Sequence, residues 1–173
     1  MQDNKLIKAL VLNAQLGNNS AFEQLYQMTV QQVYALALRL SNSKVQAENL
    51  TIKTYLNAWA KISLKSENVS FLPWLKKIAI ESLTTENERI KQNSNNENLD
   101  GMTLSADEEK FFNDNGLEKH ISQLQLKEKN VYVLHDIEKL SFTEISKLLS
   151  ISEEELKDKL AQTRELLIGL TNS

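Results

Sequence analysis

The sequence predicts an all-α protein with two small helical domains joined by a flexible acidic linker. Residues that break helices are rare, because the 173 residues include one proline and four glycines. Apolar side chains recur at helical spacing in both halves of the chain. Only a central stretch, 92–115, lacks this pattern. We therefore expect one helical domain at 1–91 and a second at 116–173.

The N-terminal domain is predicted to contain four helices. Gly17 and Asn18 end the first, and a capping box of Ser20 and Glu23 begins the second. Ser43 begins the third helix, with Gln46 three residues on, and this helix extends to about residue 62. Pro73 is tolerated in the first turn of the fourth, which extends to about residue 91.

The apolar side chains of the third and fourth helices are expected to face the core. Both tryptophans are among them, and we expect these to pack in the core rather than stack on bases. In the third helix the inward residues are expected to be Val45, Ile52, Tyr55, Leu56, Trp59 and Ile62. In the fourth helix they are expected to be Phe71, Trp74, Leu75, Ile78 and Ala79.

The stretch between the domains is polar, rich in asparagine and acidic. Residues 92–114 carry six acidic side chains and one basic side chain. Such a composition cannot bury enough apolar surface to fold alone, so a flexible linker is predicted. Phe111 and Phe112 are its apolar exceptions. We expect them either to dock on one of the domains or to form a short helix.

The C-terminal domain is predicted to have four helices, of which the last two form a helix-turn-helix over 141–167. Leu117 begins one helix and Lys127 the next. Capping boxes start the final two, Ser141 with Glu144 and Ser152 with Glu155. A small core is expected to lock these two helices across each other: Ile145, Leu148, Leu149, Ile151, Leu156 and Leu160.

Composition excludes several functional classes. The chain has no cysteine, so a disulfide, a thiolate metal site and a cysteine nucleophile are ruled out. No apolar run approaches the ~20 residues of a transmembrane helix, and the first residues lack a long apolar secretion segment. His120 and His135 lie on separate predicted helices, and adjacent residues such as His135 and Asp136 do not face each other on an α-helix. We expect a cytoplasmic protein that is no enzyme and holds no metal or cofactor.

The charge of the last helix conflicts with its position in a helix-turn-helix. Residues 153–167 carry five acidic and three basic side chains, and the helix begins Glu153-Glu154-Glu155. The helix dipole and the capping box favour acid in that turn. In a DNA groove the same glutamates either accept hydrogen bonds from cytosine amino groups or repel the phosphates.

The order of these segments resembles the extracytoplasmic-function sigma factors of bacterial RNA polymerase. AENLTIKTYLNAWAKI (47–62) is similar to the polymerase-binding helix of that family, and FLPWLKKIAIESL (71–83) to its promoter-melting segment. LQLKEKNVYVLHDIEKLSFTEISKLLSIS (124–152) is similar to the domain that reads the distal promoter element. The resemblance implies core RNA polymerase, promoter DNA and an anti-sigma protein as partners, with no membrane insertion.

The resemblance also implies two sets of site residues. The polymerase-binding set comprises Glu48, Asn49, Ile52, Lys53 and Leu56. The DNA-binding set consists of basic residues from both domains: Lys76, Lys77, Arg89, Lys147, Lys157, Lys159 and Arg164.

Departures from the family support an alternative function. The family usually has aspartate where this chain has Asn49 and glutamine where it has Ile52, and acidic Glu81 and Glu88 lie in the promoter-melting segment. The alternative is a degenerate sigma-like regulator that binds a protein partner, anti-sigma factor or polymerase, without promoter recognition. A plain helical adaptor remains if neither partner binds.

Overall fold

The computed structural model describes residues 2–41, 43–93, 120–121 and 124–171. At helix ends, for residues 2–4, 84–93, 126 and 171, the backbone alone is described. All regular secondary structure in the described ranges is helical, which confirms the predicted all-α class. Apart from residues 92 and 93, which end a helix, the predicted linker lies outside the described residues.

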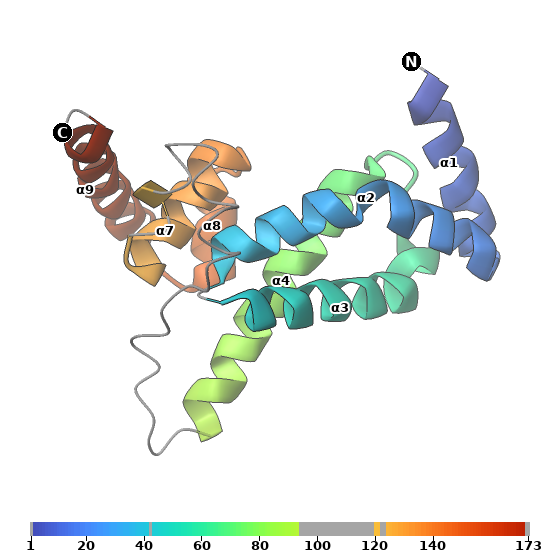
Figure 1. Ribbon diagram of the computed structural model, residues 1–173, viewed down its shortest axis with the longest axis horizontal. Coiled ribbons are helices and arrows are strands. Elements are labelled where there is room, and N and C mark those ends of the chain that lie inside the picture. The colour runs from blue at the N-terminus through green and yellow to red at the C-terminus, as the bar shows by residue number, and fades with distance from the viewer. Residues whose placement is uncertain (1, 42, 94–119, 122–123, 172–173) are drawn as a thin grey trace. The chain divides into compact units, whose positions relative to one another are not determined.

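The chain divides into two compact units, residues 1–37 with 47–93 and residues 38–46 with 94–173. The first unit contains the helices α1 (Gln2–Gln15) and α4 (Phe71–Asn93), with the 3-10 turn η1 (Ile62–Leu64), and most of α2 (Asn19–Leu40) and α3 (Lys44–Lys61) (Figure 1). The end of α2, from residue 38, and the start of α3, to residue 46, belong to the second unit. Helix α1 packs against η1 and α4. The core includes Leu10, Ala14, Leu25, Val33, Tyr55, Ala58, Phe71, Leu75 and Ile78.

The helix starts in this unit follow local capping chemistry. Asn18, not Ser20, caps α2, because its Oδ1 accepts the Ala21 N–H at 3.1 Å. The predicted capping box at Ser20 is therefore wrong, since Ser20 lies inside the helix. Ser43 does cap α3, where its Oγ accepts the Gln46 N–H at 3.3 Å.

The second unit contains α7 (Leu126–Tyr132), the π-helical turn η2 (Val133–Ile137), α8 (Phe142–Leu149) and α9 (Glu153–Thr171). Helix α9 packs against both α7 and α8. Buried apolar side chains form its core: Ile121, Leu124, Val131, Val133, Leu134, Ile145, Leu156, Leu160 and Leu167. Within the described ranges, every helix is too short or too polar to span a bilayer.

Candidate protein and nucleic-acid interfaces

Helix α3 presents an apolar stripe to solvent. Val45, Ile52, Leu56 and Trp59 are 63%, 59%, 65% and 37% exposed. Exposed Asn49 lies in the same row, because residues separated alternately by four and three positions share one face of a helix. We call these five residues the α3 seam. The expectation that Val45, Ile52 and Leu56 face the core is wrong.

The core-facing side of α3 consists mostly of small and hydroxyl-bearing residues, together with Leu50. Ala47 and Ala58 are fully buried, and so is Thr54. The buried hydroxyls are satisfied locally, because Thr51 Oγ1 donates to the Ala47 carbonyl at 2.8 Å and Thr54 Oγ1 to the Leu50 carbonyl at 2.7 Å. Small side chains with satisfied polar groups let this side of α3 pack closely, while Val45, Ile52 and Leu56 lie outside.

Aromatic rings fix the end of the α3 seam. The Trp59 ring lies 4.9 Å from the Phe22 ring, centroid to centroid. Next to it, the Tyr26 and Tyr55 rings meet edge to face at 4.7 Å. The Tyr55 hydroxyl shares a 2.9 Å hydrogen bond with Thr29, and burial raises the pKa of Tyr55 to about 12. The expected core position of Trp59 is therefore only half right, since one part of its ring packs and the other is open.

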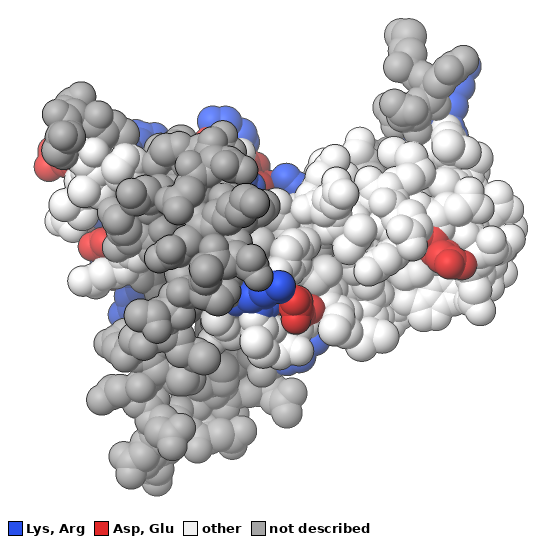
Figure 2. Space-filling model, in the orientation of Figure 1, with Lys and Arg blue, Asp and Glu red and all other residues white. Residues whose placement is uncertain are grey.

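The predicted polymerase-binding residues all belong to the outer part of α3. Glu48, Asn49, Ile52 and Leu56 are exposed, and Lys53 is half-buried and engaged in a further interaction. Figure 2 shows few charged side chains over α2 and the later part of α3 in this view, and adjacent blue and red groups near the start of α3. The outer part of α3 therefore offers an apolar row with few charges to a protein partner.

On α4, the predicted DNA-binding lysines occupy different environments. Lys77 is exposed, whereas Lys76 is half-buried and has an interaction partner. Glu81, one of the acidic residues that depart from the family pattern, forms a 3.3 Å ion pair with Lys61. The lysine partly neutralises its charge. The side chain of Arg89 lies outside the described residues.

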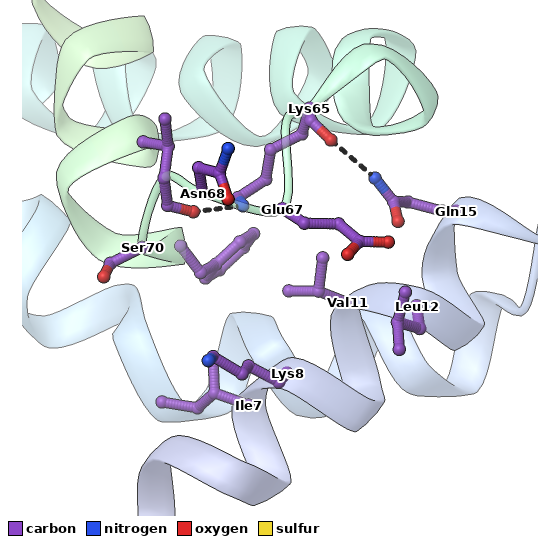
Figure 3. A pocket seen from close by; sticks show the side chains of 11 residues that line it. Ile7, Lys8, Val11, Leu12, Gln15, Lys65, Glu67, Asn68 and Ser70 are labelled. Carbon is purple, nitrogen blue, oxygen red and sulfur yellow. Dashed lines mark hydrogen bonds between the residues drawn. The ribbon is translucent and has the colours of Figure 1, made fainter.

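A pocket of about 440 Å³ lies between α1 and the loop that precedes α4 (Figure 3). The Lys65 side chain closes this loop, because its ammonium donates to the carbonyls of Ser66 and Val69. Gln15 secures the loop from α1 by donating to the carbonyls of Ile62 and Lys65 at 3.1 and 2.9 Å. Burial lowers the pKa of Lys65. This pocket was not predictable from the sequence, because neither Lys65 nor Gln15 belongs to a recognisable motif.

Local chemistry fixes the turn between α8 and α9. Ser141 and Glu144 form the predicted capping box at the start of α8. Ser150 follows α8 in the left-handed conformation, with φ 55° and ψ 43°. Ser152 then caps α9 by accepting the Glu155 N–H at 3.2 Å. Helix, turn and helix thus follow the predicted order.

The outward face of α9 is acidic. Leu156, Leu160, Thr163 and Leu167 are buried and mark the inward face. Glu154, Asp158 and Glu165, which we call the acidic stripe, are exposed. At 3.6 residues per turn, this stripe lies on the side of α9 opposite the buried row. A groove facing that side would meet three carboxylates.

Neighbouring side chains engage the cations of α9. Lys159 Nζ lies 3.6 Å from a carboxylate oxygen of Glu155, and Lys157 Nζ lies 5.7 Å from the centre of the Phe142 ring. Arg164 donates to both carboxylate oxygens of Asp136, from Nε at 2.9 Å and from Nη2 at 2.6 Å. Lys147, in the last turn of α8, is exposed.

The π-helical turn brings His135 and Asp136 together, contrary to the expectation that these neighbours diverge. His135 Nδ1 lies 2.8 Å from Asp136 Oδ1, and the imidazole stacks on the Phe142 ring with centroids 4.4 Å apart. The wider π turn changes the angle between successive side chains, which an α-helical period does not anticipate. Hydrogen bonding from Arg164, with a smaller contribution from His135, holds the pKa of Asp136 below its usual value. Arg164 thus orients this carboxylate and is itself held by it.

Comparisons with known proteins agree on one family. Residues 11–88 match the family described as Sigma-70 region 2. The chain is 24% identical to the ECF RNA polymerase sigma factor SigW of Bacillus subtilis strain 168, over 94% of this chain and 95% of SigW. It is 23% identical to SigM of the same organism, over 87% of this chain and 94% of SigM. Among solved structures, the sigma factor RpoE in complex with the anti-sigma factor NepR from Bartonella quintana aligns with a TM-score of 0.61 and 17% identity, covering 87% of this chain and 96% of that one.

Proposed function

We propose, from the premise that this chain belongs to the extracytoplasmic-function group of the sigma-70 family, that it binds core RNA polymerase and directs it to promoter DNA. The chemistry is recognition and strand opening, without a covalent step, a metal or a cofactor. The protein acts in the cytoplasm, where polymerase and promoters are found.

The α3 seam is the observation that carries this proposal. A helix in a small globular unit normally turns its larger apolar side chains inward. Helix α3 buries Leu50 and Tyr55 but exposes Val45, Ile52 and Leu56. Contiguous exposed apolar side chains mark surfaces that bind other proteins. This surface coincides with the helix whose sequence resembles the polymerase-binding helix of the family.

The DNA contacts in this proposal come from cations that remain accessible. Lys77 on α4 and Lys147 on α8 are both exposed. Each phosphate that a lysine neutralises releases a counterion and makes affinity fall with salt. Lys76, Arg89, Lys157, Lys159 and Arg164 complete the proposed set. A cation already paired, such as Arg164 with Asp136, gains less from a phosphate because its charge is partly neutralised.

An anti-sigma protein is a further proposed partner. The aligned RpoE structure is a complex with an anti-sigma factor. The α3 seam is one surface that such an inhibitor would cover, since polymerase and inhibitor would then compete for the same apolar side chains.

Reconstitution tests the proposed function. Purified chain is added to bacterial core RNA polymerase, and complex formation and transcription from native-host promoters are measured. We expect a stoichiometric complex and transcripts that depend on the chain. Absence of both would overturn the proposal. Changing Lys76 and Lys77 together to alanine should weaken open-complex formation, and unchanged transcription would remove these lysines from the DNA site.

The acidic stripe favours the second candidate function, a sigma-like regulator that binds a protein partner without promoter recognition. Its three carboxylates lie on the face of α9 opposite the buried row, so DNA that bound this face would meet them. This function predicts binding to polymerase or an anti-sigma protein with weak DNA affinity and little dependence on salt. Sub-micromolar DNA affinity that falls steeply with salt would argue for promoter binding instead.

A further inference from the structure

The pocket between α1 and the loop before α4 has the size and lining of a small-molecule site. Its volume of about 440 Å³ falls within the roughly 300–1,000 Å³ that ligand pockets occupy. Apolar side chains form its floor: Ile7, Val11 and Leu12 from α1 and Phe71 from the first turn of α4. All residues that line the pocket belong to the first unit, so the site lies within one compact part of the chain.

Hydrogen bonds hold the loop side of the pocket in position. Gln15 ties the loop to α1 through the carbonyls of Ile62 and Lys65, at 3.1 and 2.9 Å. The Lys65 ammonium closes the loop on itself through the carbonyls of Ser66 and Val69. A ligand that enters the pocket therefore meets a wall that is already ordered, which lowers the entropic cost of binding.

The charged groups of the pocket are separated by sign. Figure 3 shows, in this view, the nitrogens of Lys8 and Lys65 on one side of Val11 and the carboxylate of Glu67 on the other. Lys8 and Glu67 are exposed, and no hydrogen bond or ion pair to either charge occurs among the described residues. Lys65 is 7% exposed, and the two carbonyls use two of its three N–H groups. Glu67 attracts this buried ammonium, but no carboxylate of the described residues forms an ion pair with it, so an anion beside it is favoured.

We propose that this pocket binds a small zwitterion with an aliphatic body, the chemistry shared by aliphatic amino acids and short aliphatic peptides. The ligand carboxylate lies beside Lys8 and the remaining N–H of Lys65, and the ligand ammonium meets Glu67. The aliphatic body packs on Val11 and Phe71. This site goes beyond the proposed function, because binding at it requires neither polymerase nor DNA. A bound ligand bridges α1 and the loop that leads into α4, so occupancy stabilises the first unit.

The test is calorimetric titration of the full chain with L-leucine and with L-leucyl-L-leucine. We expect one site per chain, with a dissociation constant of about 0.1–1 mM for the better ligand, as the affinity per atom of small ligands implies. The better of the two ligands identifies the source, a free amino acid or a short peptide. The thermal unfolding temperature should rise as the ligand concentration exceeds this constant.

Substitutions at the two exposed charges assign the ends of the ligand. Lys8→Gln and Glu67→Gln should each weaken binding about three- to fivefold, since each removes an exposed ion pair with the ligand. Lys5→Gln and Glu23→Gln are matched controls, because both residues are exposed outside the pocket. N-acetylation removes the ligand ammonium, so the acetylated ligand should bind equally to the unmodified chain and to Glu67→Gln. Amidation of the ligand carboxylate should likewise abolish the effect of Lys8→Gln.

Three results would overturn the zwitterion site. One is no binding of either ligand at about 10 mM, well above the expected dissociation constant. Another is an affinity that Lys8→Gln and Glu67→Gln change no more than the control variants do, which would place the ligand elsewhere. The third is tighter binding of a nucleoside monophosphate than of either zwitterion, which would assign the pocket to nucleobases. A chain that binds the zwitterion but not polymerase would support this site and contradict the proposed function.

Discussion

Neutralising the acidic stripe of α9 should increase the affinity of this protein for DNA. The perturbation is the triple substitution Glu154→Gln, Asp158→Asn and Glu165→Gln. These side chains are exposed on the face opposite buried Leu156 and Leu160. DNA that approaches this face meets the three carboxylates before it reaches the flanking cations.

Coulomb's law gives the size of the effect. Two unit charges about 8 Å apart in water repel by roughly 0.5 kcal/mol, and ~0.1 M salt reduces this by about half. If each carboxylate faces about two phosphates, the three together contribute about 1.5 kcal/mol of repulsion. The triple variant should therefore bind a duplex roughly tenfold more tightly, and the gain should shrink as salt increases.

Fluorescence anisotropy with a labelled duplex measures this change. A control variant, Glu23→Gln with Glu48→Gln and Glu67→Gln, removes the same charge from exposed positions in the first unit. An equal gain in the control would show that only net charge matters. Weaker binding by the triple variant would refute the repulsion argument, and would indicate that a carboxylate such as that of Glu154 accepts hydrogen bonds from cytosine.

Three further predictions concern stability, and urea or thermal unfolding tests each. Asp136→Asn should cost roughly 1 kcal/mol at neutral pH, because a bidentate but half-exposed ion pair with Arg164 is lost. Because the pKa of Asp136 is lowered in the folded state, its stabilising effect is fully present above the ordinary aspartate pKa of about 3.9 and is lost as pH falls through the folded pKa. If the wild type and Asp136→Asn differ in stability by the same amount at pH 7 and pH 2.5, this prediction is contradicted. Ser150→Gly should raise the free energy of unfolding by roughly 1 kcal/mol by relieving the left-handed serine, and a loss of stability would contradict that strain. Ala58→Leu should lower the free energy of unfolding by about 1–3 kcal/mol by overfilling the core, whereas Leu56→Ala should change it by less than about 0.5 kcal/mol. A larger loss for Leu56→Ala than for Ala58→Leu would show that the assigned inward face of α3 is wrong.

Helix α3 shows how far the sequence predicts this fold. Helical spacing and the Ser43 cap predict where the helix lies. The same spacing cannot say which side is buried, because the apolar residues favour one face and the small residues another. Thr51 and Thr54 are polar in isolation, yet their hydroxyls are satisfied within the helix, so burying them is inexpensive. Ranking residues by hydrophobicity therefore placed Tyr55 and Ile62 correctly in the core but placed Val45, Ile52 and Leu56 there wrongly.

The candidate sites of the second unit show a similar division. Capping at Ser141 and Ser152 was predictable, because it depends on residues three positions apart. The contact of His135 with Asp136 was not, because it needs the π turn. The pairing of Arg164 with Asp136 joins residues 28 positions apart and depends on how the η2 turn lies against α9. The sequence therefore reveals the charge of a basic residue in α9 but not whether that charge is already paired.

The α3 seam has a consequence for the amount of free protein that a cell can tolerate. Contiguous exposed aliphatic side chains on a neutral surface promote association between identical molecules. Molecules whose seam is left uncovered would then be prone to aggregate. Co-production with a protein that covers the seam should raise the soluble yield, as should a polar side chain at Ile52.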